Sequence, residues 1–170
     1  MLKYIGLIAI ALTLSIAFAN SRSVAANQNR AEASNSVSKN SNDNVKLIER
    51  YYEAYGRGDT EYMRENVFAP DIKWTIPGRH PLAKVYNGVD EVVGFFEKLK
   101  EGNFKAQTLF LEANDEYVVD MHRGWGNAKG QKIDILWCLV YRIKGGKIVE
   151  ARNFPGDQHK ADKFFNAVYR

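Results

Sequence analysis

The sequence contains a single cysteine, three histidines and four prolines among 170 residues, and its charges nearly balance. The lone Cys138 cannot form an internal disulfide, so a hydrophobic core has to hold the fold together. The 24 basic and 20 acidic residues leave a net charge of +4, a weak excess that does not indicate the basic face of a nucleic-acid-binding protein. The histidines are dispersed without paired ligand spacing, so we predict no metal site and no nucleic-acid partner.

The motifs of nucleotide-binding proteins and of serine hydrolases are also missing. The sequence has neither a phosphate-binding glycine loop nor a nucleophile elbow. Gly124, Gly126 and Gly130 are more typical of a shaped loop than of a nucleotide site. We therefore predict no cofactor.

Long apolar runs are absent except at the N-terminus. Residues 4–18 are almost uninterruptedly apolar, follow Lys3, and end in the small-x-small pattern Ala17-Phe18-Ala19, which predicts a secretory signal peptide over residues 1–26. Cleavage is expected after Ala19 or, at a second site, after Ala26. Because the run is shorter than the ~20 residues of a membrane span, we expect export to the periplasm or the extracellular space without stable membrane contact. An uncleaved N-terminal anchor is the alternative.

The segment after the signal peptide is rich in Asn and Ser. Residues 27–43 have too few apolar side chains to offset the entropy lost on ordering, so we predict a disordered spacer. With 45% hydrophobic residues overall, the remaining residues 44–170 are enough for one core and hence one domain.

Helical periodicity dominates the first half of this domain. Apolar residues at three- and four-residue spacings predict a helix that starts at Asp43 and ends before Gly56. A short second helix is expected from Asp59 or Thr60 to just before Pro70, a third over residues 89–100, and a final one over residues 158–170.

Strand-like alternation dominates the second half. Strands are predicted over residues 72–76, 105–113, 116–123, 132–143 and 147–154, with a loop over 125–130 and a tight turn at Gly145-Gly146. Connections this short join antiparallel neighbours. The pattern indicates an α+β fold, a cone-shaped barrel in which a curved, mostly antiparallel sheet wraps around the N-terminal helices.

Four strings carry a family resemblance: IERYYEAYGRGD, YMRENVFAPDIKWTIPG, YNGVDEVVGFFEKL and LVYRIKGGKIVEARNFPG. In order and spacing they resemble the nuclear transport factor 2-like superfamily, closest to its SnoaL-like and ketosteroid-isomerase-like members, over residues 45–156. The resemblance implies the cone-shaped fold just described. It does not fix the function, because this fold hosts isomerases, cyclases, dehydratases, epoxide hydrolases and proteins that only bind.

Ketosteroid isomerases use a carboxylate base, a tyrosine and a protonated aspartic acid. The resemblance places the tyrosine at Tyr51, the base at Ile76 and the aspartic acid at Leu139. Because Ile76 and Leu139 cannot carry a proton, we do not expect the usual steroid isomerase chemistry.

The three histidines are the alternative acid–base groups. His80 follows the first strand on a proline-stiffened loop and is either a base or a residue that locks the turn through a carbonyl group. His122 is predicted on the outer face of its strand, beside Asp120, with the apolar Tyr117, Val119 and Met121 inside; a pair with His80, as in scytalone-dehydratase-like proteins, is the alternative.

The end of the last strand offers three further polar candidates. Asn153 is predicted to face the cone and to orient a ligand. His159 and Asp157 form either an acid–base dyad or, more simply, a helix start in which Asp157 is the N-cap.

Aromatic residues from several elements indicate an apolar pocket, with Tyr55, Trp74, Trp137 and Tyr141 as its predicted walls. We therefore expect a small hydrophobic ligand. The predicted function is a cofactor-independent isomerase, cyclase or lyase acting on an apolar carbonyl compound, with Tyr51 as donor and His80 or His159 as base. The alternatives are a non-catalytic binding protein and a dimeric interaction domain; a homodimer is expected.

Overall fold

The computed structural model describes residues 28, 30 and 39–170 of the chain. The chain divides into two units, Met1–Lys39 and Asn40–Arg170, and the second contains all the elements discussed below. The predicted signal peptide lies outside the described residues, as does the predicted spacer apart from residues 28, 30 and 39–43, which are helical. Within the described part of the chain, no helix has the length and apolar character needed to span a membrane.

The first helix of the second unit covers residues 40–57. The predicted start at Asp43 is wrong, because the helix already includes the residues before it. Its buried face consists of side chains spaced three and four residues apart, as the periodicity predicted: Leu47, Ile48, Tyr51 and Ala54.

A short, irregular helical segment follows. The Asp59 side chain caps α2 (Thr60–Tyr62) by accepting the Tyr62 N–H at 3.0 Å, and η1 (Met63–Val67) continues it as a π-helix. The strand β1 (Phe68–Ile76) begins directly afterwards. Pro70 therefore lies inside the strand, and the predicted boundary at this proline is wrong by a few residues.

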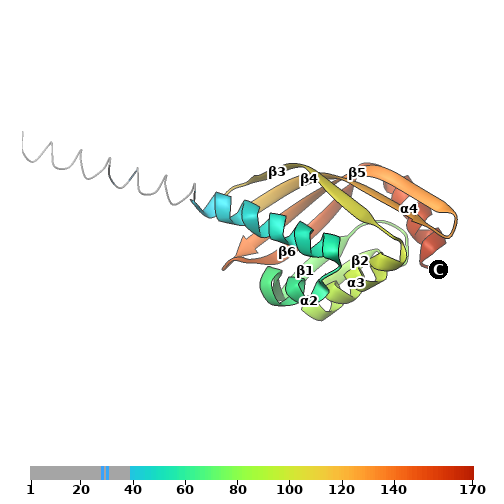
Figure 1. Ribbon diagram of the computed structural model, residues 1–170, viewed down its shortest axis with the longest axis horizontal. Coiled ribbons are helices and arrows are strands. Elements are labelled where there is room, and N and C mark those ends of the chain that lie inside the picture. Colours follow the sequence, from blue (N-terminus) through green and yellow to red (C-terminus); the bar gives the residue numbers. More distant parts are fainter. Residues whose placement is uncertain (1–27, 29, 31–38) are drawn as a thin grey trace, which may run out of the picture. The chain divides into compact units, whose positions relative to one another are not determined.

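One mixed sheet carries the fold (Figure 1). Its other strands are β2 (Lys84–Asn87), β3 (Lys105–Ala113), β4 (Tyr117–Ala128), β5 (Gln131–Lys144) and β6 (Lys147–Pro155). The spatial order is β2-β1-β6-β5-β4-β3, in which only β1 and β6 are parallel. The predicted α+β fold with a mostly antiparallel sheet is confirmed.

Two sheet segments differ from the prediction. β2 was not predicted, because it is four residues long and lies in a stretch broken by proline and glycine. The loop predicted over residues 125–130 is mostly strand, since β4 continues to Ala128 and the turn is made by Lys129 and Gly130, whose φ angles are +49° and +74°. The glycine turn at Gly145-Gly146 is confirmed by positive φ angles at both residues.

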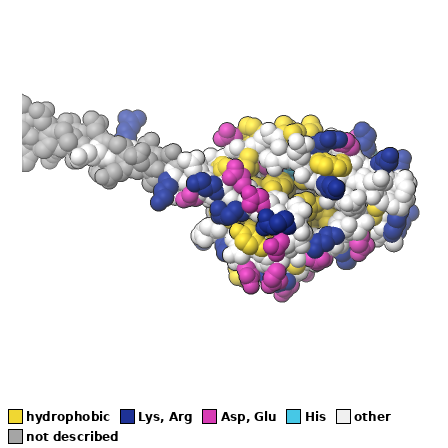
Figure 2. Space-filling model, viewed as in Figure 1, with side chains coloured by type: hydrophobic (Ala, Val, Ile, Leu, Met, Phe, Trp, Pro, Cys, Tyr) yellow, Lys and Arg dark blue, Asp and Glu magenta, His cyan; other side chains and the backbone are white. Residues whose placement is uncertain are grey.

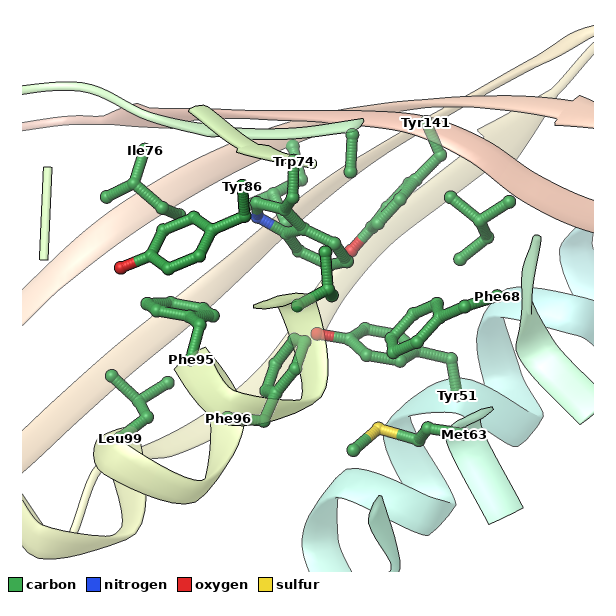
Figure 3. Packing of buried hydrophobic residues seen from close by; sticks show 14 of the residues in the cluster. Tyr51, Met63, Phe68, Trp74, Ile76, Tyr86, Phe95, Phe96, Leu99 and Tyr141 are labelled. Atoms are coloured by element: carbon green, nitrogen blue, oxygen red, sulfur yellow. The ribbon is translucent and has the colours of Figure 1, made fainter. Parts of the chain in front are cut away.

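The helices lie against the sheet and enclose the core. α3 (Val89–Glu101) contacts β1 and β2, and α4 (Gln158–Val168) contacts β5. Rings from the first helix, α3 and the sheet meet in the middle (Figure 3). Trp74 and Phe96 pack edge to face with centroids 5.2 Å apart, and Tyr51 lies 6.0 Å from Trp74 and from Tyr141. Aromatic side chains thus fill the centre of the cone.

Candidate functional site

The site is built on β4, whose two faces are the reverse of those predicted. Val118, Asp120 and His122 are buried, whereas Tyr117 and Met121 are about 40% exposed. The prediction that His122 lies on the outer face was therefore wrong. The rule that apolar side chains point inward fails here because the inward polar groups satisfy one another and are joined by two tyrosines.

Asp120 is the centre of this polar cluster and is completely buried. Its Oδ1 lies 2.7 Å from His122 Nδ1, and its Oδ2 accepts the hydroxyl protons of Tyr52 and Tyr141, each at 2.7 Å. Tyr52 comes from the first helix and Tyr141 from β5, so the cluster joins three elements. A carboxylate with three donors is well satisfied without water.

This contact to Asp120 indicates which tautomer of the His122 ring is present. A carboxylate only accepts hydrogen bonds, so we assign the imidazole proton to Nδ1, which leaves a lone pair on Nε2. In the described part of the chain, His122 Nε2 has no hydrogen-bond partner, and Trp137 Nε1 is the one fully buried side-chain nitrogen or oxygen without one. Because His122 Nε2 also lacks a partner but is not fully buried, it keeps some solvent-accessible surface, although only 7% of the side chain is exposed.

The tyrosines around Asp120 stay protonated. Burial, followed by Tyr51 and by the Asp120 charge, raises the pKa of Tyr52 well above its usual value. Burial also raises the pKa of Tyr141, with further contributions from Tyr52 and Asp120. Both phenols are therefore hydrogen-bond donors rather than bases at neutral pH.

An open cavity of about 300 Å³ borders this cluster at Tyr52. We call it the mouth; it is lined by Tyr52, Tyr55, Gly56, Phe104, Lys105, Ala106 and Trp125. Tyr52 belongs to both the mouth and the Asp120 cluster, so a molecule in the mouth can contact this one member of the cluster. On the face in Figure 2, hydrophobic side chains gather along the first helix and the nearby sheet edge, among Lys and Arg side chains.

Tyr55 separates the mouth from a smaller cavity. Its hydroxyl donates to the Phe104 carbonyl oxygen at 2.8 Å and ties the first helix to the start of β3. Tyr55 and Phe104 also line the second cavity, of about 50 Å³, on the side of Met63 and Phe96. The predicted pocket wall at Tyr55 thus lies where two cavities meet.

His80 has a different environment from His122. Its Nε2 donates to the Pro77 carbonyl oxygen and its Nδ1 accepts the Leu82 N–H, both at 3.2 Å. The ring packs on Phe165 of α4, 4.8 Å between centroids. Burial lowers the pKa of His80, while Asp162 and the Pro77 carbonyl partly oppose this. This geometry favours the turn-locking interpretation, with a neutral imidazole whose two nitrogens are already bonded.

The remaining polar candidates have partners within the fold. Asn153 Oδ1 accepts the Trp74 indole N–H at 2.7 Å, which joins β6 to β1. Asp157 caps α4 by accepting the Lys160 N–H at 2.9 Å, as the simpler interpretation predicted, and His159 is exposed in the first turn. These residues are not brought to the Asp120 cluster.

The predicted tyrosine donor, Tyr51, does not line the mouth, whereas its neighbour Tyr52 does. Tyr51 is only 4% exposed and packs in the aromatic core, and burial raises its pKa well above the usual value. Sequence reasoning missed Tyr52 as the residue at the mouth and treated Asp120 only as a surface partner. The available signal was the spacing of Asp120 and His122, two residues apart on one strand and thus on one face.

The described residues contain no group of three His, Cys, Asp or Glu side chains that could hold a metal ion. The cluster at Asp120 has a single imidazole and a single carboxylate. Its chemistry is therefore that of an oriented acid–base pair.

Comparisons with known proteins agree with this fold. A model of the SnoaL-like domain matches residues 48–151. The chain is 28% identical over 126 residues to the uncharacterized proteins Mb0035 of Mycobacterium bovis and Rv0034 of Mycobacterium tuberculosis, and each match covers 72% of this chain and 95% of the relative.

Solved structures show the same architecture. Bal32a from a soil-derived mobile gene cassette matches with a TM-score of 0.70 and 26% identity, covering 74% of this chain and 98% of that one. An NTF2-like protein from Burkholderia xenovorans has a TM-score of 0.66 and 24% identity over 74% and 98% of the two chains. A putative SnoaL-like polyketide cyclase from Jannaschia has a TM-score of 0.62 and 17% identity, and the match covers 76% of this chain and 95% of that one. The predicted nuclear transport factor 2-like fold is confirmed.

Proposed function

Because the chain belongs to the SnoaL-like domain family, we propose that it binds a small apolar carbonyl compound in the mouth and moves a proton on it without a cofactor. The reaction is then an isomerisation, a cyclisation or an elimination. The observation that supports this proposal is the buried Asp120–His122 pair, in which Nδ1 contacts the carboxylate and Nε2 has no hydrogen-bond partner among the described residues.

Each member of the cluster has a definite task in this proposal. His122 Nε2 takes a proton from the carbon next to the carbonyl group and returns it later. Asp120 holds the imidazole in the required tautomer and stabilises the imidazolium that forms. Tyr52 and Tyr141 hold the Asp120 carboxylate in place by donating to Oδ2. A positioned base of this kind contributes about 10²- to 10⁴-fold to a rate.

The proposal is tested by proton exchange, which requires no knowledge of the natural product. Cyclic ketones such as 1-tetralone are incubated with the protein in D₂O, and the loss of the α-proton signal is followed by NMR. We expect faster exchange with the wild type than with buffer, and a loss of about 10²-fold or more of this acceleration in His122→Gln. His159→Gln, exposed on α4, is the matched control and should equal the wild type. Acceleration that survives in His122→Gln, or disappears in His159→Gln, would contradict the proposal.

A non-catalytic binding protein is the second candidate. Ile76 and Leu139, at the positions of the two family carboxylates, are 6% and 2% exposed and belong to the apolar core. This lack of carboxylates favours binding without turnover. Saturable binding of 1-tetralone without any acceleration of exchange would support this second function over the first.

We also propose that two copies of the chain pair through the outer face of the sheet. One apolar row crosses four strands in register: Phe110, Met121, Cys138 and Phe154. Phe110, Met121 and Phe154 are 48%, 39% and 47% exposed, and exposed apolar surface of this continuity is typical of an interface. We expect a dimer by light scattering and a monomer for Met121→Lys. A monomeric wild type would refute the pairing.

A further inference from the structure

The indole N–H of Trp137 is an unused hydrogen-bond donor. Trp137 lies on β5 and is 5% exposed, and its Nε1 is buried without a partner among the described residues. An unpaired buried donor destabilises a fold, and such groups are rare in native proteins. By contrast, Trp74, which is equally buried in the core, donates its indole N–H to Asn153.

This donor lies beside the proposed base. Trp137 is directly opposite His122 in the β4–β5 register, and both side chains point to the buried face. Cβ atoms of directly opposed residues are about 4.5–5.5 Å apart. The two ring nitrogens that lack protein partners, His122 Nε2 and Trp137 Nε1, therefore come from adjacent positions on one surface.

Gly124 sets the position of the indole. A Cβ atom at Gly124 would lie 2.5 Å from Trp137 Nε1 and 2.6 Å from its Cδ1. The indole edge that carries the N–H thus rests on the backbone of β4, in space left by the missing side chain. A larger residue at position 124 would push the donor away from the strand that carries His122.

Phe104 connects this donor to the mouth. Its ring meets Trp137 edge to face with centroids 5.8 Å apart, and the same residue lines the mouth beside Tyr52 and Tyr55. One aromatic side chain therefore lies between the cavity and the indole. Phe104 is itself partly exposed.

We propose that Trp137 Nε1–H binds the carbonyl oxygen of the ligand and so determines which molecules the site accepts. This inference rests on the proposed function, and it specifies the ligand class: a small apolar molecule with an acceptor oxygen near an acidic C–H group. An indole N–H only donates, so it suits a carbonyl oxygen or an enolate and does not suit a hydrocarbon.

The proton and electron count is simple. His122 Nε2 takes the α-proton, the C–H electron pair forms a C=C bond, and the C=O π pair moves onto oxygen. That oxygen gains negative charge and accepts the Trp137 N–H more strongly than the ketone did. The imidazolium then returns its proton to carbon, so no oxidant or co-reactant is consumed.

The test compares 1-tetralone with tetralin, the hydrocarbon that lacks its oxygen. The probe is the indole ¹H–¹⁵N signals of the three tryptophans, assigned with Trp137→Phe or, if that variant does not fold, by elimination with Trp125→Phe and Asn153→Ala. We expect 1-tetralone to move the Trp137 signal downfield and tetralin to leave it without such a shift. The Trp74 signal, already bonded to Asn153, is the internal control and should stay in place.

The affinities supply the second measurement. In Trp137→Phe, the Kd of 1-tetralone should rise about tenfold, while that of tetralin changes by less than about twofold. Suppose that 1-tetralone moves the signal of Trp125 at the mouth, but the Trp137 signal stays in place and the Kd of Trp137→Phe equals that of the wild type. The Trp137 inference is then overturned, while the proposed binding of 1-tetralone in the mouth is retained. If neither compound moves any indole signal, the proposed binding of apolar carbonyl compounds fails as well.

Discussion

Replacing Asp120 with asparagine tests the assigned tautomer of His122. The amide keeps the size of the carboxyl group, but one oxygen becomes an NH₂ donor. Oδ2 accepts from two tyrosines and Oδ1 from a single imidazole. The NH₂ group therefore turns toward His122, where it conflicts with one donor instead of two. His122 then accepts at Nδ1, and its proton moves to Nε2.

This change has a small effect on stability and a large effect on catalysis. Three charge-assisted hydrogen bonds become neutral, and each weakens by about 1 kcal/mol. The variant also no longer buries a negative charge, whose desolvation opposes folding, so we expect the free energy of unfolding to fall by at most about 2 kcal/mol. A protonated Nε2 has no lone pair, and the equivalent tautomer change in a serine protease lowers kcat by about 10⁴.

Two measurements check this prediction. Long-range ¹H–¹⁵N spectra of the histidine rings report which nitrogen carries the proton, and the D₂O exchange of 1-tetralone reports proton transfer. Asp162→Asn is the matched control, because Asp162 Oδ1 lies 4.0 Å from His80 Nε2 but outside the mouth. A variant with asparagine at Asp120 that still exchanges at the wild-type rate, or whose His122 keeps its proton on Nδ1, would refute the reasoning.

Three other changes test the fold around the site. Gly124→Ala places a Cβ atom 2.5 Å from Trp137 Nε1 and should lower the free energy of unfolding by about 1–3 kcal/mol in a denaturant titration. The control is Gly94→Ala in α3, where a Cβ atom would have nothing within 4 Å, and it should raise the free energy of unfolding by about 0.5–1 kcal/mol. Equal effects of the two substitutions would contradict the described packing of Trp137 on Gly124. Burial lowers the pKa of His80 in the folded state from 6.5, so its contribution to stability is present above pH 6.5 and lost as the pH falls through the folded value. In His80→Gln the free energy of unfolding should therefore fall less steeply as the pH is lowered. A pH profile of stability identical to that of the wild type would contradict this prediction. The mass of exported protein should correspond to cleavage at one of the two predicted signal sites, whereas an intact N-terminus would support the anchor.

The sequence was informative wherever the interaction is local. His80 bonds to Pro77 and Leu82, its near neighbours, and a histidine between prolines already suggested a locked turn. The Asp157 cap is equally local, since its partner is three residues away. Most helices and long strands followed from periodicity, because one face of each is buried; β3 is the exception, with no buried residue.

The Asp120 cluster depends on residues far apart in the chain. Tyr52 is 68 residues from Asp120, and Tyr141 is 21 residues away. Without these donors an inward carboxylate is unfavourable, so the alternation of β4 predicted the wrong face. If the outer face of the sheet pairs with a second copy of the chain, as proposed above, that pairing explains why the outer residues Val119 and Met121 are apolar. On β4 the more apolar face points outward, so hydrophobicity alone orders its two faces wrongly.

The position of β6 in the sheet has a consequence for how the chain folds. This last strand lies between β5 and β1, and its parallel pairing with β1 joins segments separated by most of the domain. Until residues 147–155 are available, the hairpin of β1 and β2 and the meander of β3 to β5 each keep an open edge. Long-range closure of this kind is slow, and unpaired edges promote association with other chains. A chain that emerges in the N-to-C direction, from a ribosome or through a membrane, therefore closes this sheet only after nearly all of it has emerged.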